Sequence, residues 1–304
     1  MKSIGVIGPG AHFKKKIFPV LVKSNFFKLS GILRKNKIIK FKNIQNFSED
    51  EFFKKNFDFV YISCPNILHE QFIIRSLNTG SHVICEKPFL VRNKNINRIM
   101  KIANKKNKLI FESFMYIYHP AFKFIKNAIL KKKYGKLNYL ISNFRFPSLE
   151  KKNNRYKNNE GAGFFYDSAC YLVSLENILF KKKASNKVIK QKIINNVDLR
   201  GNIFINSDEC CRFYFWGEGQ NYSNKIEIFF EKATIHIDKF FSKNENEIIV
   251  ADIYTTKKKS IEFKKVNQFE QMFDQIKKNY KKKSFQTFHS NMIKKQLNLM
   301  LKLI

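Results

Sequence analysis

The stretch SHVICEKP, residues 81–88, decides how the rest of the chain is interpreted. Residues 81–85 are apolar enough for a buried strand. Pro88 ends that strand, because proline cannot donate to a sheet ladder and disfavours helix at the preceding residue. Lys87 is therefore predicted at the carboxyl end of a strand, where open α/β sheets bind ligands. An ammonium group there can bind a substrate oxygen and lower the pKa of a nearby phenol. The competing interpretation is a surface lysine, because lysine is abundant throughout the chain.

A glycine turn follows the first predicted strand. Residues 2–7 form an apolar strand that runs into GPGAHF, residues 8–13, and an amphipathic helix is predicted over residues 16–24. Two glycines at this spacing permit a tight turn and bring a pyrophosphate close to the backbone N–H groups at a helix N-terminus. Phe13 takes the place of the third glycine of this fingerprint, so helix and strand must pack in another way. The predicted dinucleotide contacts are Gly8, Gly10, Ala11 and His12.

The second predicted strand, residues 29–33, indicates which dinucleotide is bound. An NAD enzyme usually has a carboxylate after this strand to accept from the ribose hydroxyls, whereas here Arg34 and Lys35 follow. A guanidinium pairs with phosphate and a carboxylate would repel it, so Arg34 favours NADP. NAD stays open because basic pairs are common in this chain.

Strands and helices alternate with short loops over the first 112 residues, which is the βαβ pattern of a parallel sheet. From residue 187 the pattern changes to alternating β-branched and aromatic residues, typical of antiparallel strands, and two helices over residues 267–278 and 285–302 close the chain. The predicted antiparallel strands are residues 188–197, 208–216, 225–230, 233–237, 247–253 and 260–263. The predicted class is α/β: an N-terminal Rossmann domain, residues 1–119, and a C-terminal α+β domain, residues 120–304, with a mainly antiparallel open sheet.

The run from Asp58 through Pro65-Asn66, His69 and Gly80 to Glu86-Lys87-Pro88 resembles the signature of the Gfo/Idh/MocA oxidoreductases. The resemblance implies that Lys87 contacts both the substrate and the nicotinamide ribose. It also implies that the Lys87–Pro88 bond can be cis, as X–Pro bonds allow at small cost. The cofactor contacts it implies are Gly8, Gly10, Cys64, Pro65, Asn66 and Glu86, with His69 as a further candidate that could instead pack at its helix start.

A second informative stretch is GAGFFYDSACY, residues 161–171. Asp167 and Tyr171 are four residues apart, so a helix would place both on one face. An acid in an apolar helix needs a reason, because burying an unpaired carboxylate is costly; the competing interpretation is a structural aspartate in a core helix. The stretch is similar to the GGG…D-x-G-x-[H/Y] segment of the same family, with alanine at two glycine positions. That similarity implies that Asp167 binds a substrate hydroxyl and that Tyr171, assisted by Lys87, transfers the proton.

These residues predict an NAD(P)-dependent oxidoreductase acting on CH–OH groups. Arg145, Arg155 and Tyr156 are expected near the substrate, and two arginines favour a phosphorylated or nucleotide-linked sugar. A free sugar, inositol or a dihydrodiol stays open. A member that binds the dinucleotide without catalysis is the alternative.

The net charge of +34 invites a nucleic-acid hypothesis. We discount it, because only eight of the 58 basic residues are arginine and no recognition motif accompanies the charge. The five cysteines lack a disulfide or metal spacing, and neither a signal peptide nor a membrane span is apparent, so we expect a reducing cytoplasm and no metal site. Homo-oligomerisation, as a dimer or tetramer, is expected through the C-terminal sheet.

Overall fold

A computed structural model describes residues 1–33, 41, 44–158, 160–180, 186–219, 221–244 and 247–303. The chain divides into two compact units. The first contains Met1–Ser113 and Met272–Lys302, and the second contains Phe114–Gln271 with Leu303. The predicted fold class is confirmed, since one sheet is parallel with Rossmann-like order and the other is mainly antiparallel.

The first unit is built on a six-stranded parallel sheet in the order β3-β2-β1-β4-β5-β6. The strand order reverses next to β1, and ligands bind at such a switch point in open α/β sheets. Its strands are β1 (Lys2–Ile7), β2 (Phe27–Leu33), β3 (Asn46–Phe47), β4 (Phe59–Ile62), β5 (His82–Cys85) and β6 (Ile110–Glu112). Its helices are η1 (Phe13–Ile17), α1 (Phe18–Val22), α2 (Glu49–Lys54), η2 (Asn66–Leu68), α3 (His69–Asn78) and α4 (Ile96–Lys105).

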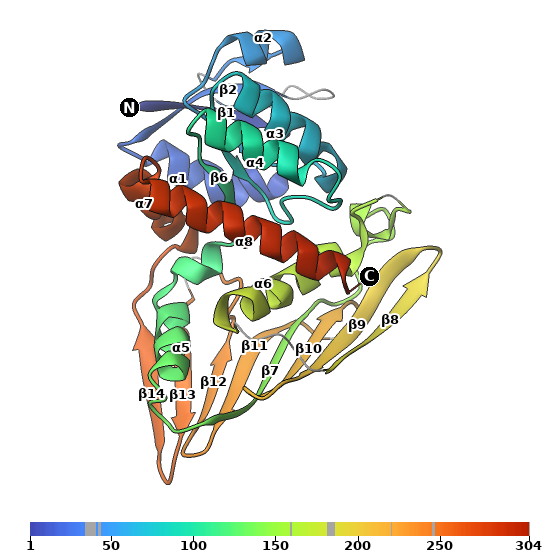
Figure 1. Ribbon diagram of the computed structural model, residues 1–304, viewed down its shortest axis with the longest axis vertical. Helices are drawn as coiled ribbons and strands as arrows, with labels where there is room; N and C mark the ends of the chain where they lie inside the picture. Colours follow the sequence, from blue (N-terminus) through green and yellow to red (C-terminus); the bar gives the residue numbers. More distant parts are fainter. Residues whose placement is uncertain are drawn as a thin grey trace. The chain divides into compact units, whose positions relative to one another are not determined.

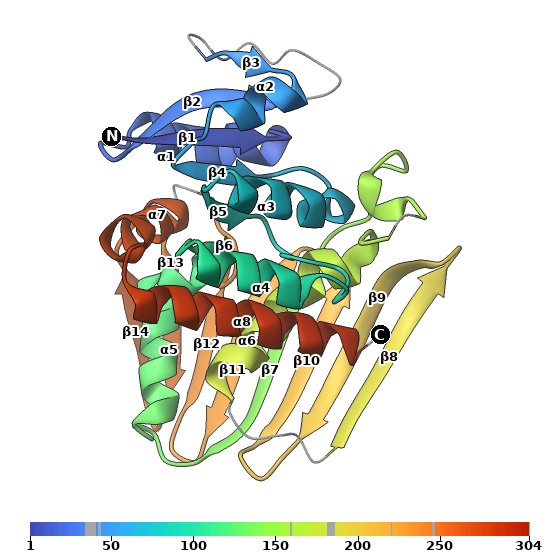
Figure 2. The ribbon, with the colours of Figure 1, turned by 45° about the horizontal axis from the view of Figure 1, so that its top comes forward.

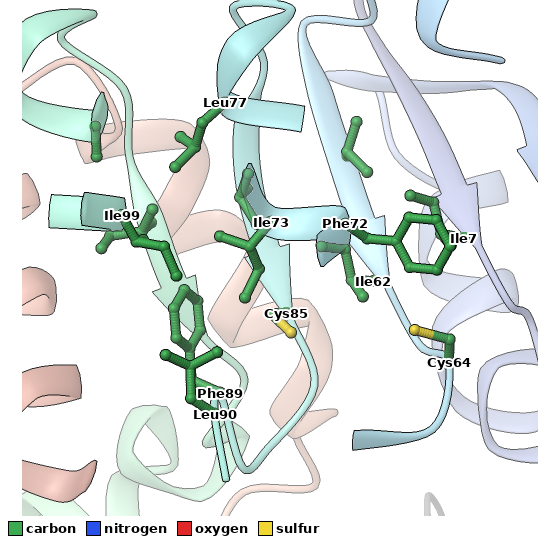
Figure 3. Close-up of a cluster of buried hydrophobic side chains, with 14 of the residues drawn as sticks. Ile7, Ile62, Cys64, Phe72, Ile73, Leu77, Cys85, Phe89, Leu90 and Ile99 are labelled. Atoms are coloured by element: carbon green, nitrogen blue, oxygen red, sulfur yellow. The ribbon is translucent and has the colours of Figure 1, made fainter. Parts of the chain in front are cut away.

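The parallel sheet buries apolar side chains on both faces, as its near-continuous apolar strands predict. On one face, Ile7 and Ile62 pack against Phe72 and Ile73 of α3 in a buried cluster that Figure 3 shows. Phe89, which follows the EKP stretch, belongs to the same cluster. The loop that carries Lys87 is therefore anchored in the core of this unit.

The two C-terminal helices, α7 (Gln268–Asn279) and α8 (Lys283–Leu301), pack largely with the first unit, whereas the predicted boundary gave them to the second. Tyr280 between them has its ring 5.2 Å from that of Phe59 in β4. In α8, the His289 ring lies 4.4 Å from that of Phe111 in β6, and Ile293 joins the buried cluster. Apolar faces on these helices thus complete the core of the parallel sheet.

The second unit is built on an eight-stranded sheet in the order β14-β13-β12-β11-β7-β10-β9-β8. Neighbouring strands are antiparallel except β7 and β10, which are parallel. The strands are β7 (Leu137–Arg145), β8 (Asn186–Ile194), β9 (Val197–Asn206), β10 (Cys211–Gly217), β11 (Ser223–Phe230), β12 (Thr234–Asp238), β13 (Ile249–Tyr254) and β14 (Lys258–Phe263).

The helices of the second unit are η3 (Met115–Tyr118), α5 (Pro120–Leu130), η4 (Asn154–Tyr156), η5 (Phe165–Ala169) and α6 (Cys170–Leu179). Figures 1 and 2 show α5 and α6 on the same face of the eight-stranded sheet, and among the described residues of this unit no helix covers the opposite face. We call that opposite face the open face.

The structure differs from the predicted strands at residues 188–206. One strand was expected over residues 188–197, but β8 and β9 form a hairpin whose turn is Asn195-Asn196. Both asparagines have positive φ, 49° and 61°, which asparagine tolerates and a two-residue hairpin turn of type I′ requires. Elsewhere, no helix among the residues described is long and apolar enough to span a bilayer.

Candidate active site

The glycine turn after β1 is shaped by two glycines with different surroundings. Gly8 has φ +66°, and a Cβ on it would lie 2.6 Å from the Cβ of Cys64, so only glycine fits there. At Gly10 a Cβ would meet no atom within 4 Å. Gly8 thus lets the turn pack on the loop after β4, while Gly10 faces open space of the kind a pyrophosphate needs.

Phe13 stands where the fingerprint has its third glycine, and it is fully buried. Its ring centroid lies 5.9 Å from that of Tyr61 and 6.0 Å from that of Phe41, with tilted or edge-on geometry. Aromatic packing thus replaces the close helix–strand contact that glycine would allow. Arg34, the predicted partner of a 2′-phosphate, lies outside the described residues.

Cys64, Pro65 and Asn66 lie where β4 ends and η2 begins, and Asn66 is the first residue of η2. Cys64 is buried, and burial raises the pKa of its thiol to about 12, so the thiol stays protonated at neutral pH. This cysteine can therefore contribute packing and its backbone, but it is not a nucleophile.

His69 is held by protein groups at the start of α3, which agrees with the alternative that it packs at its helix start. The side chain is fully buried, with Nδ1 2.9 Å from the carbonyl oxygen of Pro88 and Nε2 3.0 Å from that of Cys64. Burial lowers the pKa of the ring, so it is neutral and donates to one carbonyl at a time. His69 thus ties together the loops that follow β4 and β5.

Glu86 and Lys87 follow β5, and the Lys87–Pro88 bond is cis. The Glu86 carboxylate accepts a hydrogen bond from the buried hydroxyl of Tyr61 and lies 3.6 Å from Nε2 of His12. The structure thus brings together two of the predicted cofactor residues, His12 in the glycine turn after β1 and Glu86 after β5. The pKa of Tyr61 is raised well above its usual value, mainly by burial and also by the charge of Glu86. The hydroxyl of Tyr61 therefore stays a donor.

Glu112 is a residue that the sequence analysis did not single out. It ends β6, is 1% exposed, and accepts a 2.8 Å hydrogen bond from the backbone N–H of Phe89 through Oε1. Within the described part of the chain, Oε2 has no hydrogen-bond partner. Burial raises the pKa of Glu112 to about 8, although the Phe89 N–H and the charge of Lys87 act in the opposite direction. The sequence signal that could have singled out Glu112 is its position as an acidic residue at the end of an apolar strand.

In the second unit, Asp167 pairs with Arg155. Asp167 lies in η5, and its Oδ2 accepts a 2.7 Å hydrogen bond from Nε of Arg155. Both were predicted to bind substrate, and the structure joins them to each other. Asn153 also accepts from Arg155, at 3.3 Å, so the guanidinium is held in place.

Tyr171 lies in α6 and is 6% exposed. Aromatic rings surround it: those of Phe114, Phe144 and Phe241 have centroids 5.2 to 5.8 Å from its own. Its hydroxyl contacts Sδ of Met115 at 3.8 Å, and sulfur is a weak acceptor. The phenol is thus packed mainly among aromatic rings, and Arg155 lies near enough for an electrostatic interaction with it. In such surroundings, charge on a neighbouring group acts with little screening.

Tyr156 lies near Arg155, the partner of Asp167, whereas Arg145 lies on the open face. The hydroxyl of Tyr156 accepts from the backbone N–H of Leu149 at 2.9 Å and donates to Glu218 at 3.3 Å, so it holds its own loop. Arg145 alternates with Phe144, whose ring contacts Tyr171, and therefore lies on the open face. Lys87 belongs to the first unit, and Asp167 and Tyr171 belong to the second.

Comparison with known proteins finds a family match in the N-terminal part of the chain. Residues 2–114 match the Gfo/Idh/MocA family, described as an oxidoreductase family with an NAD-binding Rossmann fold. A dTDP-3,4-didehydro-2,6-dideoxy-alpha-D-glucose 3-reductase of Streptomyces violaceoruber is 24% identical over 154 residues, 50% of this chain and 45% of that protein. The scyllo-inositol 2-dehydrogenase (NADP(+)) IolU of Bacillus subtilis is 24% identical over 203 residues, 64% of this chain and 61% of that protein. The chain thus spans about half the length of the curated relatives that it matches.

The fold of the chain is similar to that of a solved 3-ketoreductase. KijD10, a 3-ketoreductase from Actinomadura kijaniata in complex with NADP and TDP-benzene, superposes with a TM-score of 0.89. The superposition covers 99% of this chain and 96% of KijD10 at 17% identity, so it establishes the fold. Solved variants of KijD10 include one with a tyrosine replaced by phenylalanine and one with a lysine replaced by alanine.

Proposed function

Because residues 2–114 match the family of Gfo/Idh/MocA oxidoreductases, we propose that the chain transfers a hydride between NADP and a sugar carbon. The substrate class we propose is a nucleotide-linked sugar with a CH–OH or carbonyl group at the reacting carbon. The observation that carries this proposal is the pair Lys87 and Tyr171. In KijD10 the altered lysine and the altered tyrosine are 84 residues apart, which is also the separation of Lys87 and Tyr171 here.

Tyr171 supplies the proton that accompanies the hydride in the direction of reduction. An unperturbed phenol titrates near pH ~10, too high for easy proton exchange at neutral pH. The ammonium of Lys87 favours the phenolate and stabilises negative charge that develops on the substrate oxygen. The aromatic surroundings of Tyr171 strengthen this effect, because they keep water away from the phenol.

Asp167 orients the substrate hydroxyls next to the reacting carbon. Its ion pair with Arg155 supports this role, since the guanidinium fixes the rotamer of Asp167. Arg155 is thus a positioning residue in our account rather than a direct substrate contact. An ionised carboxylate offers only acceptors, which suits a sugar hydroxyl that donates.

The residues of the glycine turn fit a dinucleotide. The open space at Gly10 accepts a pyrophosphate against the backbone of η1, and Ala11 and His12 continue that surface. Pro65 and Asn66 at the end of β4 and Glu86 at the end of β5 border the nicotinamide side in the same proposal. When bound, the nicotinamide supplies or accepts the hydride at its C4. NADP is favoured over NAD by Arg34, and both KijD10 and IolU carry NADP in their descriptions.

A panel assay tests the proposed function. The purified protein is mixed with NADPH or NADH and a dTDP-linked keto sugar or an inosose, and with NADP or NAD and the corresponding alcohols, while the absorbance of reduced nicotinamide is followed. We expect turnover with NADPH and the dTDP-linked keto sugar. Turnover only with inosose or inositol would keep the reaction and change the substrate class. NADPH binding without turnover on any substrate would contradict the proposal and favour a non-catalytic member of the family.

Assembly is a separate proposal. The open face of the eight-stranded sheet supports the homo-oligomer that the sequence predicts, because such a face is commonly buried against another layer. Light scattering after size-exclusion chromatography tests it, and a monomer at all protein concentrations would contradict it.

A further inference from the structure

The helix that carries Asp167 and Tyr171 begins without a capping side chain of its own. η5 and α6 form one continuous helical segment, because Ala169 and Cys170 at their junction both have helical backbone angles. Phe164, at the N-cap position of this segment, makes no side-chain hydrogen bond to the helix. The first N–H groups of a helix have no carbonyl partner within the helix. Their partner must therefore come from another element.

Asp198 of β9 lies against this helix start. A Cβ on Gly163, two residues before η5, would lie 3.1 Å from the carbonyl oxygen of Asp198 and 3.4 Å from its Cβ. Burial raises the pKa of Asp198, whereas the backbone N–H groups of Phe165 and Phe164 act on the carboxylate in the opposite direction. A carboxylate near the N-terminus of a helix stabilises the helix through its dipole. Asp198 thus supplies from another strand the acid that the helix lacks.

Trp216 of β10 holds both Asp198 and the first residue of η5. Its Nε1 donates a 3.0 Å hydrogen bond to Oδ2 of Asp198, and its ring centroid lies 5.6 Å from that of Phe165. Within the described ranges Oδ1 of Asp198 has no hydrogen-bond partner, so the nearby positive end of the helix is what favours charge on it. The indole, which is 1% exposed, thus fixes the carboxylate relative to the helix.

A β-bulge turns Asp198 toward the helices. A Cβ on Gly201 would lie 2.3 Å from the ring of Trp216, so Gly201 faces the helix side and its neighbour Arg200 faces the open face. Regular alternation would place Asp198, two residues before Arg200, on the open face as well. Consecutive residues of β8 pair with Arg200 and with Asp198, however, so Leu199 is one extra residue in β9. Bulges commonly re-aim a side chain in this way next to active sites.

We infer that Asp198 is a positioning residue, which fixes the first turn of the helix and, through it, the side chains of Asp167 and Tyr171. The inference rests on the proposed function, in which these two residues act on the substrate. Asp167 lies in the first turn, two residues after Phe165, and Tyr171 lies one turn further along the same helix. A displacement of about 1 Å at a reacting group can lower a rate by about a hundredfold.

Kinetics of Asp198→Ala test the inference. We expect kcat of the folded protein to fall by about tenfold or more, because the helix start loses its fixed partner. NADPH affinity should stay within about twofold of the wild type, since the glycine turn belongs to the other unit. Asp198→Asn should recover most of the lost kcat, because asparagine caps a helix about as well as aspartate. Trp216→Phe tests the same contact from the other side: it keeps an aromatic ring on Phe165, removes the donor to Asp198 and should also lower kcat.

Glu51→Ala is the matched control. Glu51 accepts a 2.9 Å hydrogen bond from the backbone N–H of Ser48 and caps α2 in the first unit. The control removes a carboxylate from another helix start, so we expect a similar loss of stability and a kcat within about twofold of the wild type. Equal kcat losses in Glu51→Ala and Asp198→Ala would overturn the inference.

Hydrogen exchange provides a measurement that needs no substrate. Amides at the start of η5 should exchange about fivefold faster in Asp198→Ala than in the wild type, and at the wild-type rate in Glu51→Ala. Unchanged exchange in Asp198→Ala would overturn the inference. Wild-type kcat in Asp198→Ala, alongside a large loss in Tyr171→Phe, would overturn the inference and leave the proposed function standing. Turnover of no substrate by the wild type would remove both.

Discussion

Glu112 holds the loop that carries Lys87 through a hydrogen bond from the backbone N–H of Phe89. Its carboxyl is buried, holds the N–H of Phe89 two residues after Lys87, and lies close enough to Lys87 for that charge to influence its pKa. With a pKa of about 8, Glu112 carries its proton at neutral pH. A neutral acid can hold the loop without forming a tight ion pair that would neutralise the Lys87 ammonium.

Glu112→Gln is predicted to change how stability depends on pH. In the unfolded chain the carboxyl ionises near its ordinary pKa of 4.5, but in the folded chain only near 8, so the folded state binds the extra proton between these values. Glu112 therefore makes the wild type lose stability as pH rises through that window. The Gln variant keeps an oxygen acceptor for Phe89 and should lack this loss. Urea unfolding at several pH values measures it, and parallel pH profiles for the two proteins would contradict the assignment.

At the residue scale, the sequence singled out polar residues as ligand contacts but could not predict which protein groups these residues contact. The family resemblance suggested His69 as a cofactor contact, and Arg155 and Tyr156 were expected near the substrate. In the structure, His69 contacts two carbonyl oxygens, Arg155 contacts Asp167, and Tyr156 contacts a backbone N–H and Glu218. Single-sequence reasoning could not find these partners, because each depends on how a loop folds back.

At the scale of elements, the turn between β1 and η1 combines a structural and a ligand-facing glycine. The two roles are separable, since Gly8 packs on Cys64 with positive φ and Gly10 has empty space at its Cβ position. The spacing of the two glycines was readable from the sequence, whereas their different roles required the position of the loop after β4.

Gly8→Ala and Gly10→Ala are predicted to affect different properties, the first the stability of the fold and the second the binding of NADPH. Gly8→Ala should cost about 2 kcal/mol or more in the free energy of unfolding, because a left-handed conformation disfavours a side chain and the new methyl group would collide with Cys64. Gly10→Ala should leave stability within about 0.5 kcal/mol, as expected where no contact changes. It should nevertheless weaken NADPH binding, because the methyl group fills the proposed pyrophosphate space. Chemical denaturation measures the change in stability, and NADPH fluorescence titration measures the change in affinity. Unchanged NADPH affinity in Gly10→Ala would contradict the proposed cofactor site.

The β8–β9 hairpin shows where element prediction failed. Asn195-Asn196 is a recognisable signal for a two-residue turn, but the stretch before it is rich in lysine and isoleucine, and the sequence analysis predicts one strand over residues 188–197 that runs through the turn. Missing that turn also hid the row of Lys192, Arg200 and Arg145 across the sheet, which exists only in the observed register.

At the scale of the whole molecule, the chain returns to its first unit at the end. The βαβ pattern made the parallel sheet predictable, but no pattern in residues 272–302 indicates that they pack with it. An amphipathic helix indicates that it has an apolar face, not which sheet receives that face. The predicted boundary after residue 119 could not anticipate this return.

Ile293→Ala in α8 is predicted to destabilise the first unit. Ile293 is 1% exposed and belongs to the buried cluster that contains Phe89 and Leu90, so its removal leaves a cavity. Large-to-small changes of this kind cost about 2–5 kcal/mol. The exposed neighbour Lys295→Ala serves as the control, with an expected change within about 0.5 kcal/mol. Hydrogen exchange of β5 and β6 amides should accelerate in the Ile293 variant, and unchanged exchange there would contradict the packing of α8 on this sheet.

The measurement that tests the central claim most directly is a comparison of turnover and NADPH binding in Tyr171→Phe and Lys87→Met. Removing a positioned acid–base group costs about a hundredfold or more in rate, so our account predicts that loss in kcat for each variant. NADPH affinity should stay within about threefold of the wild type in Tyr171→Phe, since the phenol acts on the substrate rather than on the cofactor. Wild-type turnover in either variant would contradict the claim that these two residues move the proton.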